Sequence, residues 1–209
     1  MTAVIFDCDG TLVDSEPLAG RAWRRTVAPY GYEVTDADLE ACMGIPYART
    51  HAYLSERAAL PDAATFWPRL REELFGLIDA ELAPFPDAVE AAEELRARGV
   101  ALAVASSSPR ERLDRTLARA GLSFPVTVAG DEVQHGKPAP DMFLAAAARL
   151  GTDPAQTVVV EDSDPGVEAG RAAGMPTLGV RRSPHTPALA AADRVVERIT
   201  AEAILELVR

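Results

Sequence analysis

The sequence predicts an α/β fold in which a parallel sheet is interrupted by an inserted helical module. From residue 85 onward, short apolar runs alternate with helical segments, a pattern typical of right-handed crossovers and a parallel sheet. Residues 4–6 are an apolar run that reads as the end of a first buried strand. Residues 15–83 show helix start and stop signals but no convincing strand. Because this helical stretch follows the first strand, we expect it to be an insertion.

Two domains follow from this pattern. The α/β core takes residues 1–14 and 84–209, and the helical module takes residues 15–83. The two junctions, near Asp14 and near Ala83, are candidate hinges. Within the module, Pro17 suits the first turn of a helix that begins at Ser15. The four helices expected in the module span residues 15–30, 36–44, 48–58 and 63–82.

In the core, most predicted helices end at a glycine, the residue that most often closes a helix. These glycines are Gly99, Gly121, Gly151 and Gly174. The expected core helices span residues 87–98, 110–120, 139–150, 165–173 and 201–208. After the first strand, the expected strands span residues 100–105, 126–129, 157–160, 177–180 and 194–196.

Composition excludes several classes of protein. Lys and Arg number 21 against 32 Asp and Glu, giving a net charge of −11, whereas a nucleic-acid-binding surface is basic. Phosphorylated small molecules are not excluded, since one lysine and a metal suffice for them. The two cysteines are far apart, so we expect no disulfide and a reducing compartment. No membrane-spanning run and no signal peptide is expected, and the default is a cytoplasmic monomer without membrane or nucleic-acid partners.

Two carboxylates, Asp7 and Asp9, directly follow the first strand. Residues i and i+2 of a strand point the same way, so both acids face one point at the carboxyl edge of the sheet, where ligands bind. At about 4 Å they would repel by roughly 4 kcal/mol. A bound cation, a shared proton, or both must offset that repulsion. The alternative is a surface loop, because Asp-Gly is a common turn pair.

Three more predicted strand ends carry polar side chains. Ser106 can donate to a phosphate oxygen or simply cap the next helix. Lys137 lies in a proline-stiffened turn before a helix, where the dipole disfavours a cation; it is either a solvated lysine or a fixed counter-charge. Glu161 and Asp162 end an apolar strand, although one of them could cap a helix. A parallel sheet brings all these ends to one edge, and their oxygen atoms suit Mg²⁺.

At this point the sequence resembles the haloacid dehalogenase superfamily over nearly its whole length. Within the superfamily, the segments Asp14-Ser15-Glu16-Pro17-Leu18 and Ala105-Ser106-Ser107-Ser108-Pro109 most resemble the β-phosphoglucomutase and hexose-phosphate phosphatase branch. The resemblance implies a Rossmann-like sheet of order 3-2-1-4-5 and a four-helix cap at the inserted module. The motifs that carry it are Asp7-Cys8-Asp9-Gly10-Thr11-Leu12-Val13, the Ser106 strand end, Lys137-Pro138 and Glu161-Asp162-Ser163-x-x-Gly166.

The resemblance also implies a role for each motif residue. Asp7 would attack phosphorus, and Asp9 would serve as general acid and base. Mg²⁺ would be held by Asp7, the Asp9 carbonyl, Asp162 and Glu161. The phosphoryl oxygens would be held by Ser106, Lys137 and the backbone N–H groups of Cys8, Asp9 and Ser107. Gly44, Ile45, Tyr47, Arg49 and Ser108 are the expected substrate contacts.

The resemblance separates the possible reactions. An acid at position 9 favours phosphate esters over the dehalogenases, which lack it, and over phosphonate-cleaving members, which have a small residue there. β-Phosphoglucomutases carry an arginine where this chain has Tyr47 and a histidine where it has Ala19. We therefore expect a Mg²⁺-dependent phosphatase of a small phosphorylated metabolite, a sugar phosphate first among them, with a sugar phosphomutase as the alternative. A phospho-accepting receiver module and an inactive binding protein rank below both.

Overall fold

The computed structural model describes residues 2–42, 47–182 and 188–208. The chain forms two compact units. The core unit comprises Met1–Asp14 and Ala83–Arg209, and the cap unit comprises Ser15–Leu82. Among the residues described, no helix combines the length and the apolar character that a membrane crossing requires.

The core unit contains a parallel sheet with six strands in its described part. The order is β3-β2-β1-β4-β5-β6, with every neighbouring pair parallel. The predicted parallel α/β fold and the order 3-2-1-4-5 are confirmed, and β6 adds an edge strand. The strands are β1 (Ala3–Phe6), β2 (Ala101–Ala105), β3 (Val126–Val128), β4 (Thr157–Glu161), β5 (Thr177–Val180) and β6 (Arg194–Val196).

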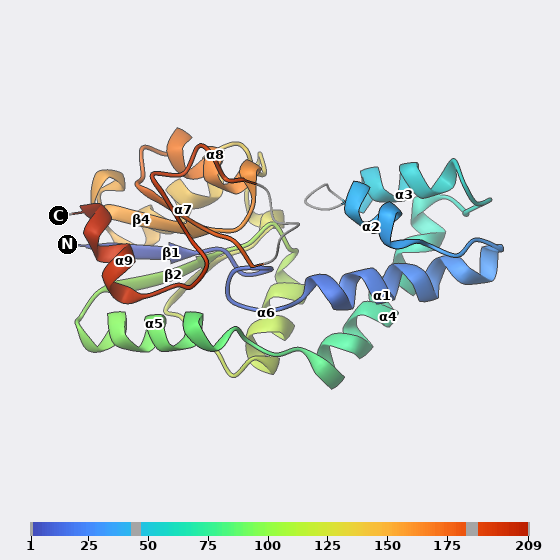
Figure 1. Cartoon of the computed structure of the whole chain (residues 1–209), viewed down its shortest axis with the longest axis horizontal. Coiled ribbons are helices and arrows are strands. Elements are labelled where there is room, and N and C mark those ends of the chain that lie inside the picture. The colour runs from blue at the N-terminus through green and yellow to red at the C-terminus, as the bar shows by residue number, and fades with distance from the viewer. Residues whose placement is uncertain (1, 43–46, 183–187, 209) are drawn as a thin grey trace. The chain divides into compact units, whose positions relative to one another are not determined.

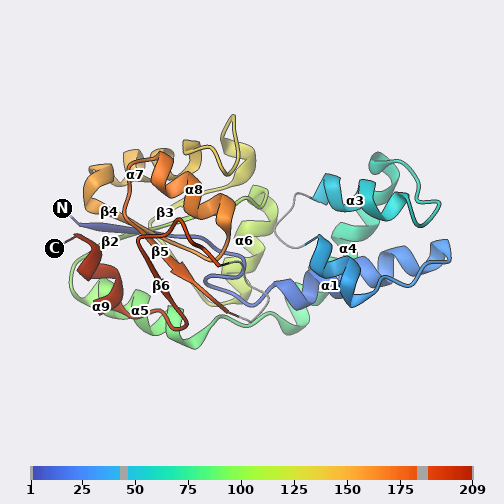
Figure 2. The ribbon, with the colours of Figure 1, turned by 45° about the horizontal axis from the view of Figure 1, so that its top comes forward.

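Helices cover both faces of this sheet (Figures 1 and 2). α7 (Asp141–Leu150) and α8 (Asp164–Ala172) lie on one face, and α5 (Pro86–Ala97) and α9 (Ala201–Leu205) lie on the other. α6 (Arg110–Arg119) connects β2 to β3. Short 3-10 helices span Gly130–Glu132, Pro154–Gln156 and Glu206–Val208. The sequence pattern did not predict the first two, and the third forms the end of the helix predicted over residues 201–208.

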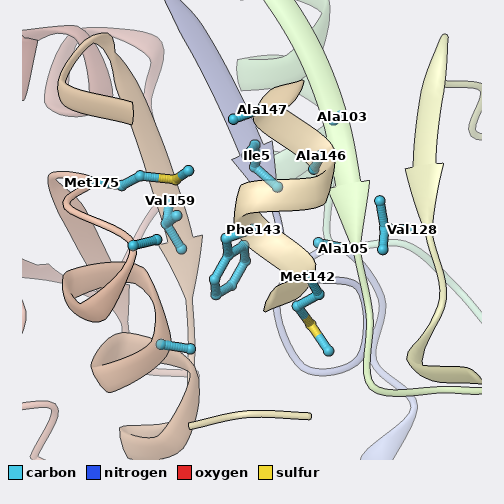
Figure 3. Close-up of a cluster of buried hydrophobic side chains, with 12 residues drawn as sticks. Ile5, Ala103, Ala105, Val128, Met142, Phe143, Ala146, Ala147, Val159 and Met175 are labelled. Carbon is cyan, nitrogen blue, oxygen red and sulfur yellow. The ribbon is translucent and has the colours of Figure 1, made fainter. Parts of the chain in front are cut away.

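The core lies between the central strands and α7. Met142 and Phe143 on α7 are fully buried and point toward the sheet, where they meet Ile5 of β1 and its neighbours (Figure 3). β1 is buried along its whole length and lies between β2 and β4. Burying such side chains contributes about 1.5–3 kcal/mol each, so the strand that precedes Asp7 lies on a rigid support.

The cap unit is the predicted helical insertion between β1 and β2. Trp23 is 3% exposed and stacks on Phe66, with ring centroids 5.5 Å apart, so the prediction that it packs inside the cap is confirmed. Tyr47 meets Trp23 edge-on at 5.7 Å. The helices are α1 (Glu16–Val27), a 3-10 turn (Ala28–Tyr30), α2 (Asp36–Ala41), α3 (Tyr47–Ser55) and α4 (Ala63–Glu81).

A buried carboxylate, Asp38, connects α2 to its surroundings inside the cap unit. Its oxygens accept hydrogen bonds from the N–H and hydroxyl of Thr35 and from the hydroxyls of Tyr32 and Tyr53, at 2.7–3.0 Å. Arg57 lies 3.3 Å away. Burial alone would raise the pKa of Asp38, but these donors outweigh burial and lower it to about 2.

Candidate active site

The polar residues predicted at the strand ends lie at one edge of the sheet. Asp7 directly follows β1, and its N–H donates to the Val160 carbonyl at 2.9 Å, so strand pairing continues through it. Ser106 follows β2 and pairs in the same way with β3 at 3.0 Å. Glu161 is the last residue of β4. Parallel pairing therefore brings together residues that are far apart in the chain.

A buried lysine joins two of these acids. Lys137 Nζ donates to Asp7 Oδ1 and, at 2.6 Å, to Glu161 Oε1. The side chains of Lys137 and Asp7 are each 7% exposed, and that of Glu161 is 1% exposed. The open question of whether Lys137 is a solvated lysine or a fixed counter-charge is thereby settled in favour of the counter-charge.

Burial and charge act together on these groups. Burial raises the pKa of Asp7 to about 8 against the opposing charge of Lys137, and the Glu161 charge adds to the rise. Burial alone would lower the pKa of Lys137, but Asp7 and Glu161 outweigh it and hold that pKa above its ordinary value. Lys137 therefore stays charged beside Asp7 at neutral pH.

The second oxygen of Glu161 is also engaged. Oε2 accepts from the N–H and the hydroxyl of Ser163, each at 2.8 Å. The same hydroxyl caps α8 by accepting from Gly166 N–H at 3.1 Å. Only glycine fits at position 166, because a Cβ there would collide with the Glu161 carboxylate. With both oxygens held, Glu161 is suited to orienting Lys137, and its expected role as a metal ligand stays a prediction.

Asp9 is held separately, on the side of β2 and α6. Its Oδ1 accepts from Arg112 Nη2 at 2.8 Å, and its Oδ2 accepts from Ser108 Oγ at 2.7 Å and Ser106 Oγ at 3.5 Å. Ser106 Oγ in turn accepts from Ser108 N–H at 3.1 Å. The two predicted catalytic acids thus have different partners, one a lysine and the other an arginine.

The loop after Asp7 turns sharply at Gly10, which has a φ of +82°. A Cβ at Gly10 would lie 2.8 Å from Asp162 Cγ, so only glycine leaves room for that carboxylate. Thr11 Oγ1 donates to Asp162 Oδ1 at 3.1 Å. Cys8 is fully buried, and burial raises the pKa of its thiol, which keeps it from acting as a nucleophile.

This geometry can be compared with proteins of known family. A family model for haloacid dehalogenase-like hydrolases matches residues 1–174. The chain belongs to this family. It is 40% identical over 179 residues to a phosphorylated carbohydrates phosphatase of Thermotoga maritima, covering 84% of this chain and 82% of that protein. It is 37% identical over 183 residues to the fructose-1-phosphate phosphatase YqaB of Escherichia coli, covering 85% and 95%.

The solved structure of CbbY from Rhodobacter sphaeroides in complex with phosphate matches this haloacid dehalogenase-like hydrolase with a TM-score of 0.83. The two sequences are 27% identical, and the match covers 95% of each chain. The prediction of a hydrolase from the sugar-phosphate branch of the family is therefore confirmed.

Membership of the family implies a divalent metal. Within the described ranges, no group of three or more His, Cys, Asp and Glu side chains is arranged to hold one. The predicted ligands are the carboxylates of Asp7, Asp162 and Glu161 and the backbone carbonyl of Asp9, and both oxygens of Glu161 already accept hydrogen bonds from Lys137 and Ser163. Asp7 and Asp162 supply the hard oxygen atoms that Mg²⁺ prefers, with water completing the shell. These residues fit the ion.

The predicted cap residues are only partly described. Gly44 and Ile45 lie outside the described residues. Tyr47 begins α3 and packs on Trp23, and Arg49 is exposed on the same helix. Their expected part in substrate binding stays a prediction.

The main residue that the sequence analysis missed is Arg112. It is the third residue of α6, at a helix start where the dipole disfavours a cation. The same signal singled out Lys137, but Arg110 in the same turn carries it as well, so the sequence alone does not distinguish Arg112. Among the predicted serines, Ser107 is exposed, whereas Ser108 is buried and bonded to Asp9.

Proposed function

We propose that this hydrolase is a Mg²⁺-dependent phosphatase that cleaves a small sugar phosphate through an aspartyl-phosphate intermediate on Asp7. The observation that carries the proposal is the separate anchoring of two acids at the end of β1. Lys137 holds Asp7, and Ser108 and Arg112 hold Asp9. Two neighbouring carboxylates with different partners are suited to different roles in one reaction. The named activities of the two curated relatives support a phosphorylated carbohydrate as substrate.

In the first half-reaction an Asp7 oxygen forms a bond to phosphorus as the bond from phosphorus to the sugar oxygen breaks. Asp9 gives its proton to the departing oxygen, so the sugar leaves as a neutral alcohol. In the second half-reaction the Asp9 carboxylate takes a proton from water, and the resulting nucleophile displaces Asp7 from phosphorus. Inorganic phosphate and the free enzyme result.

The remaining residues stabilise negative charge. Lys137 is buried and charged beside Asp7, where it offsets the repulsion between the carboxylate and the phosphate dianion. Ser106 Oγ and the backbone N–H groups of Cys8, Asp9 and Ser107 are assigned to the phosphoryl oxygens. Mg²⁺, held by Asp7, Asp162 and the Asp9 carbonyl, would supply the further positive charge that phosphoryl transfer requires.

A panel of sugar phosphates with Mg²⁺ tests the proposal. We expect release of inorganic phosphate; an isomeric sugar phosphate as the main product would instead support a phosphomutase. Asp7→Asn should abolish turnover in a folded protein, because an amide cannot form the acyl phosphate. Asp14→Asn, an exposed acid in the same loop region, is the matched control and should retain activity. Turnover by Asp7→Asn at the rate of the control would refute Asp7 as the nucleophile.

A further inference from the structure

Both oxygens of the Asp9 carboxylate are engaged by one segment of the chain. Arg112 binds Oδ1 and Ser108 binds Oδ2, and both residues belong to the segment from the end of β2 into α6. These contacts join residues 103 and 99 positions apart. Ser108, just before α6, and Arg112, in its first turn, therefore both constrain the rotamer of Asp9.

Arg112 occupies an unfavourable place for a cation. Its side chain is only 12% exposed, and it lies in the first turn of α6, where the helix dipole is positive. Partial burial of a guanidinium is tolerated when a carboxylate is held at hydrogen-bonding distance. The Asp9 side chain, 20% exposed, is that carboxylate. The pair thus retains enough solvent contact for Asp9 to reach a substrate.

We propose that Arg112 is a positioning residue that, with Ser108, holds the Asp9 carboxylate where it meets the leaving oxygen of the substrate. This inference rests on the proposed phosphatase function. One oxygen of Asp9 must turn from its present donors to the leaving oxygen as the substrate binds, while the contact of the other oxygen keeps the direction of the carboxylate. Displacing a catalytic group by about 1 Å can lower the rate up to about a hundredfold. Loss of the contacts that hold Asp9 should therefore slow protonation of the leaving oxygen.

The competing explanation is that Arg112 only stabilises α6. The leaving group of the substrate distinguishes the two. A sugar leaves as a strongly basic alkoxide and needs the proton from Asp9, whereas 4-nitrophenolate is weakly basic and leaves without it. The value of kcat/KM reports steps up to departure of the leaving group, and so isolates the acid role. Damage to the fold lowers both values, whereas misplacement of Asp9 lowers only the value for the sugar phosphate.

The test compares kcat/KM for 4-nitrophenyl phosphate with kcat/KM for the sugar phosphate that the wild type hydrolyses fastest, fructose 1-phosphate and glucose 6-phosphate being in the panel. We expect Arg112→Gln to lower the sugar-phosphate value about tenfold and the aryl value less than about twofold. Arg112→Lys should recover part of the loss because it restores a charged donor. Arg119→Gln, seven residues further along α6 and exposed, is the matched control and should change neither.

A double-mutant comparison completes the test. On the Asp9→Asn background, Arg112→Gln should add less than about a twofold loss, because the group it positions is already inactive. Ser108→Ala should lower the same ratio of the two kcat/KM values and serves if Arg112→Gln does not fold. Equal losses on both substrates, or a full further loss on the Asp9→Asn background, would overturn the positioning role. A wild type that releases no phosphate from any sugar phosphate would instead refute the proposed function.

Discussion

Gly10 offers a sharp test of the expected metal site because one added carbon displaces one predicted ligand. In Gly10→Ala the new Cβ would lie 2.8 Å from Asp162 Cγ, whereas carbon atoms in contact lie about 3.5–4.0 Å apart. The Asp162 carboxylate must therefore move away. The substitution leaves the charge of every residue at the sheet edge unchanged, so any loss reflects geometry.

Two costs add in Gly10→Ala, and a control separates them. The first is the left-handed backbone, with a φ of +82°, which costs an alanine about 1–2 kcal/mol. The second is the hydrogen bond from Thr11 to Asp162, worth about 1.5–3 kcal/mol when the acceptor is charged. Gly99 has a φ of +74° and nothing within 4 Å of an added Cβ, so Gly99→Ala bears only the first cost.

Urea unfolding and Mg²⁺-dependent turnover measure these costs. We expect the free energy of unfolding to fall by about 2.5–5 kcal/mol for Gly10→Ala and by about 1–2 kcal/mol for Gly99→Ala. The Mg²⁺ concentration at half-maximal activity should rise about tenfold or more for Gly10→Ala only, as expected when a bound carboxylate is misplaced. If the two variants show the same Mg²⁺ dependence, Asp162 is not a ligand of the metal.

Two further outcomes follow from the contacts of single carboxylates. Glu161→Gln leaves Lys137 with one charged partner, so kcat should fall about tenfold to a hundredfold with KM nearly unchanged; Glu168→Gln, exposed on α8, is the control. The pKa of Asp38 is about 2 in the folded protein against 3.8 as the model value, so its stabilisation is present above pH 3.8 and is lost as the pH falls toward 2. The free energy of unfolding of the wild type should drop by about 2 kcal/mol over that interval, and a curve just as steep for Asp38→Asn in urea titrations would contradict this assignment.

The sheet and the position of its polar edge could be predicted because both depend on local patterns. Short apolar runs between helices define the strands, and parallel strands bring their carboxyl ends together whatever the loops contain. The contact between Glu161 and the Asp7 edge follows from that rule, whereas Lys137 lies nine residues beyond the end of β3 and reaches Asp7 from the turn before α7. The helix starts of the cap follow in the same way from proline and capping residues, as at Pro17 and Thr35.

What could not be predicted is which partner each side chain takes. Glu161 is predicted to bind metal, and that role stays a prediction; the contacts of its two oxygens with Lys137 and Ser163 are what the sequence did not reveal. Ser108 is predicted to contact substrate, which stays a prediction, and the sequence did not reveal that its hydroxyl donates to Asp9. These choices depend on rotamers and on distances of a few tenths of an ångström, which residue spacing does not specify.

The charges at the sheet edge connect these observations. Four carboxylates lie there against two cations, a difference of two negative charges that one divalent ion would neutralise. Burial raises the pKa of Asp7 to about 8, so the negative charge of the proposed nucleophile is costly to maintain. A divalent charge nearby favours the ionised carboxylate that attacks phosphorus. A bound cation and a shared proton can each offset the repulsion between the carboxylates. Replacing the proton by the cation would leave Asp7 ionised and able to attack phosphorus. The groups counted are Asp7, Asp9, Glu161 and Asp162 against Lys137 and Arg112.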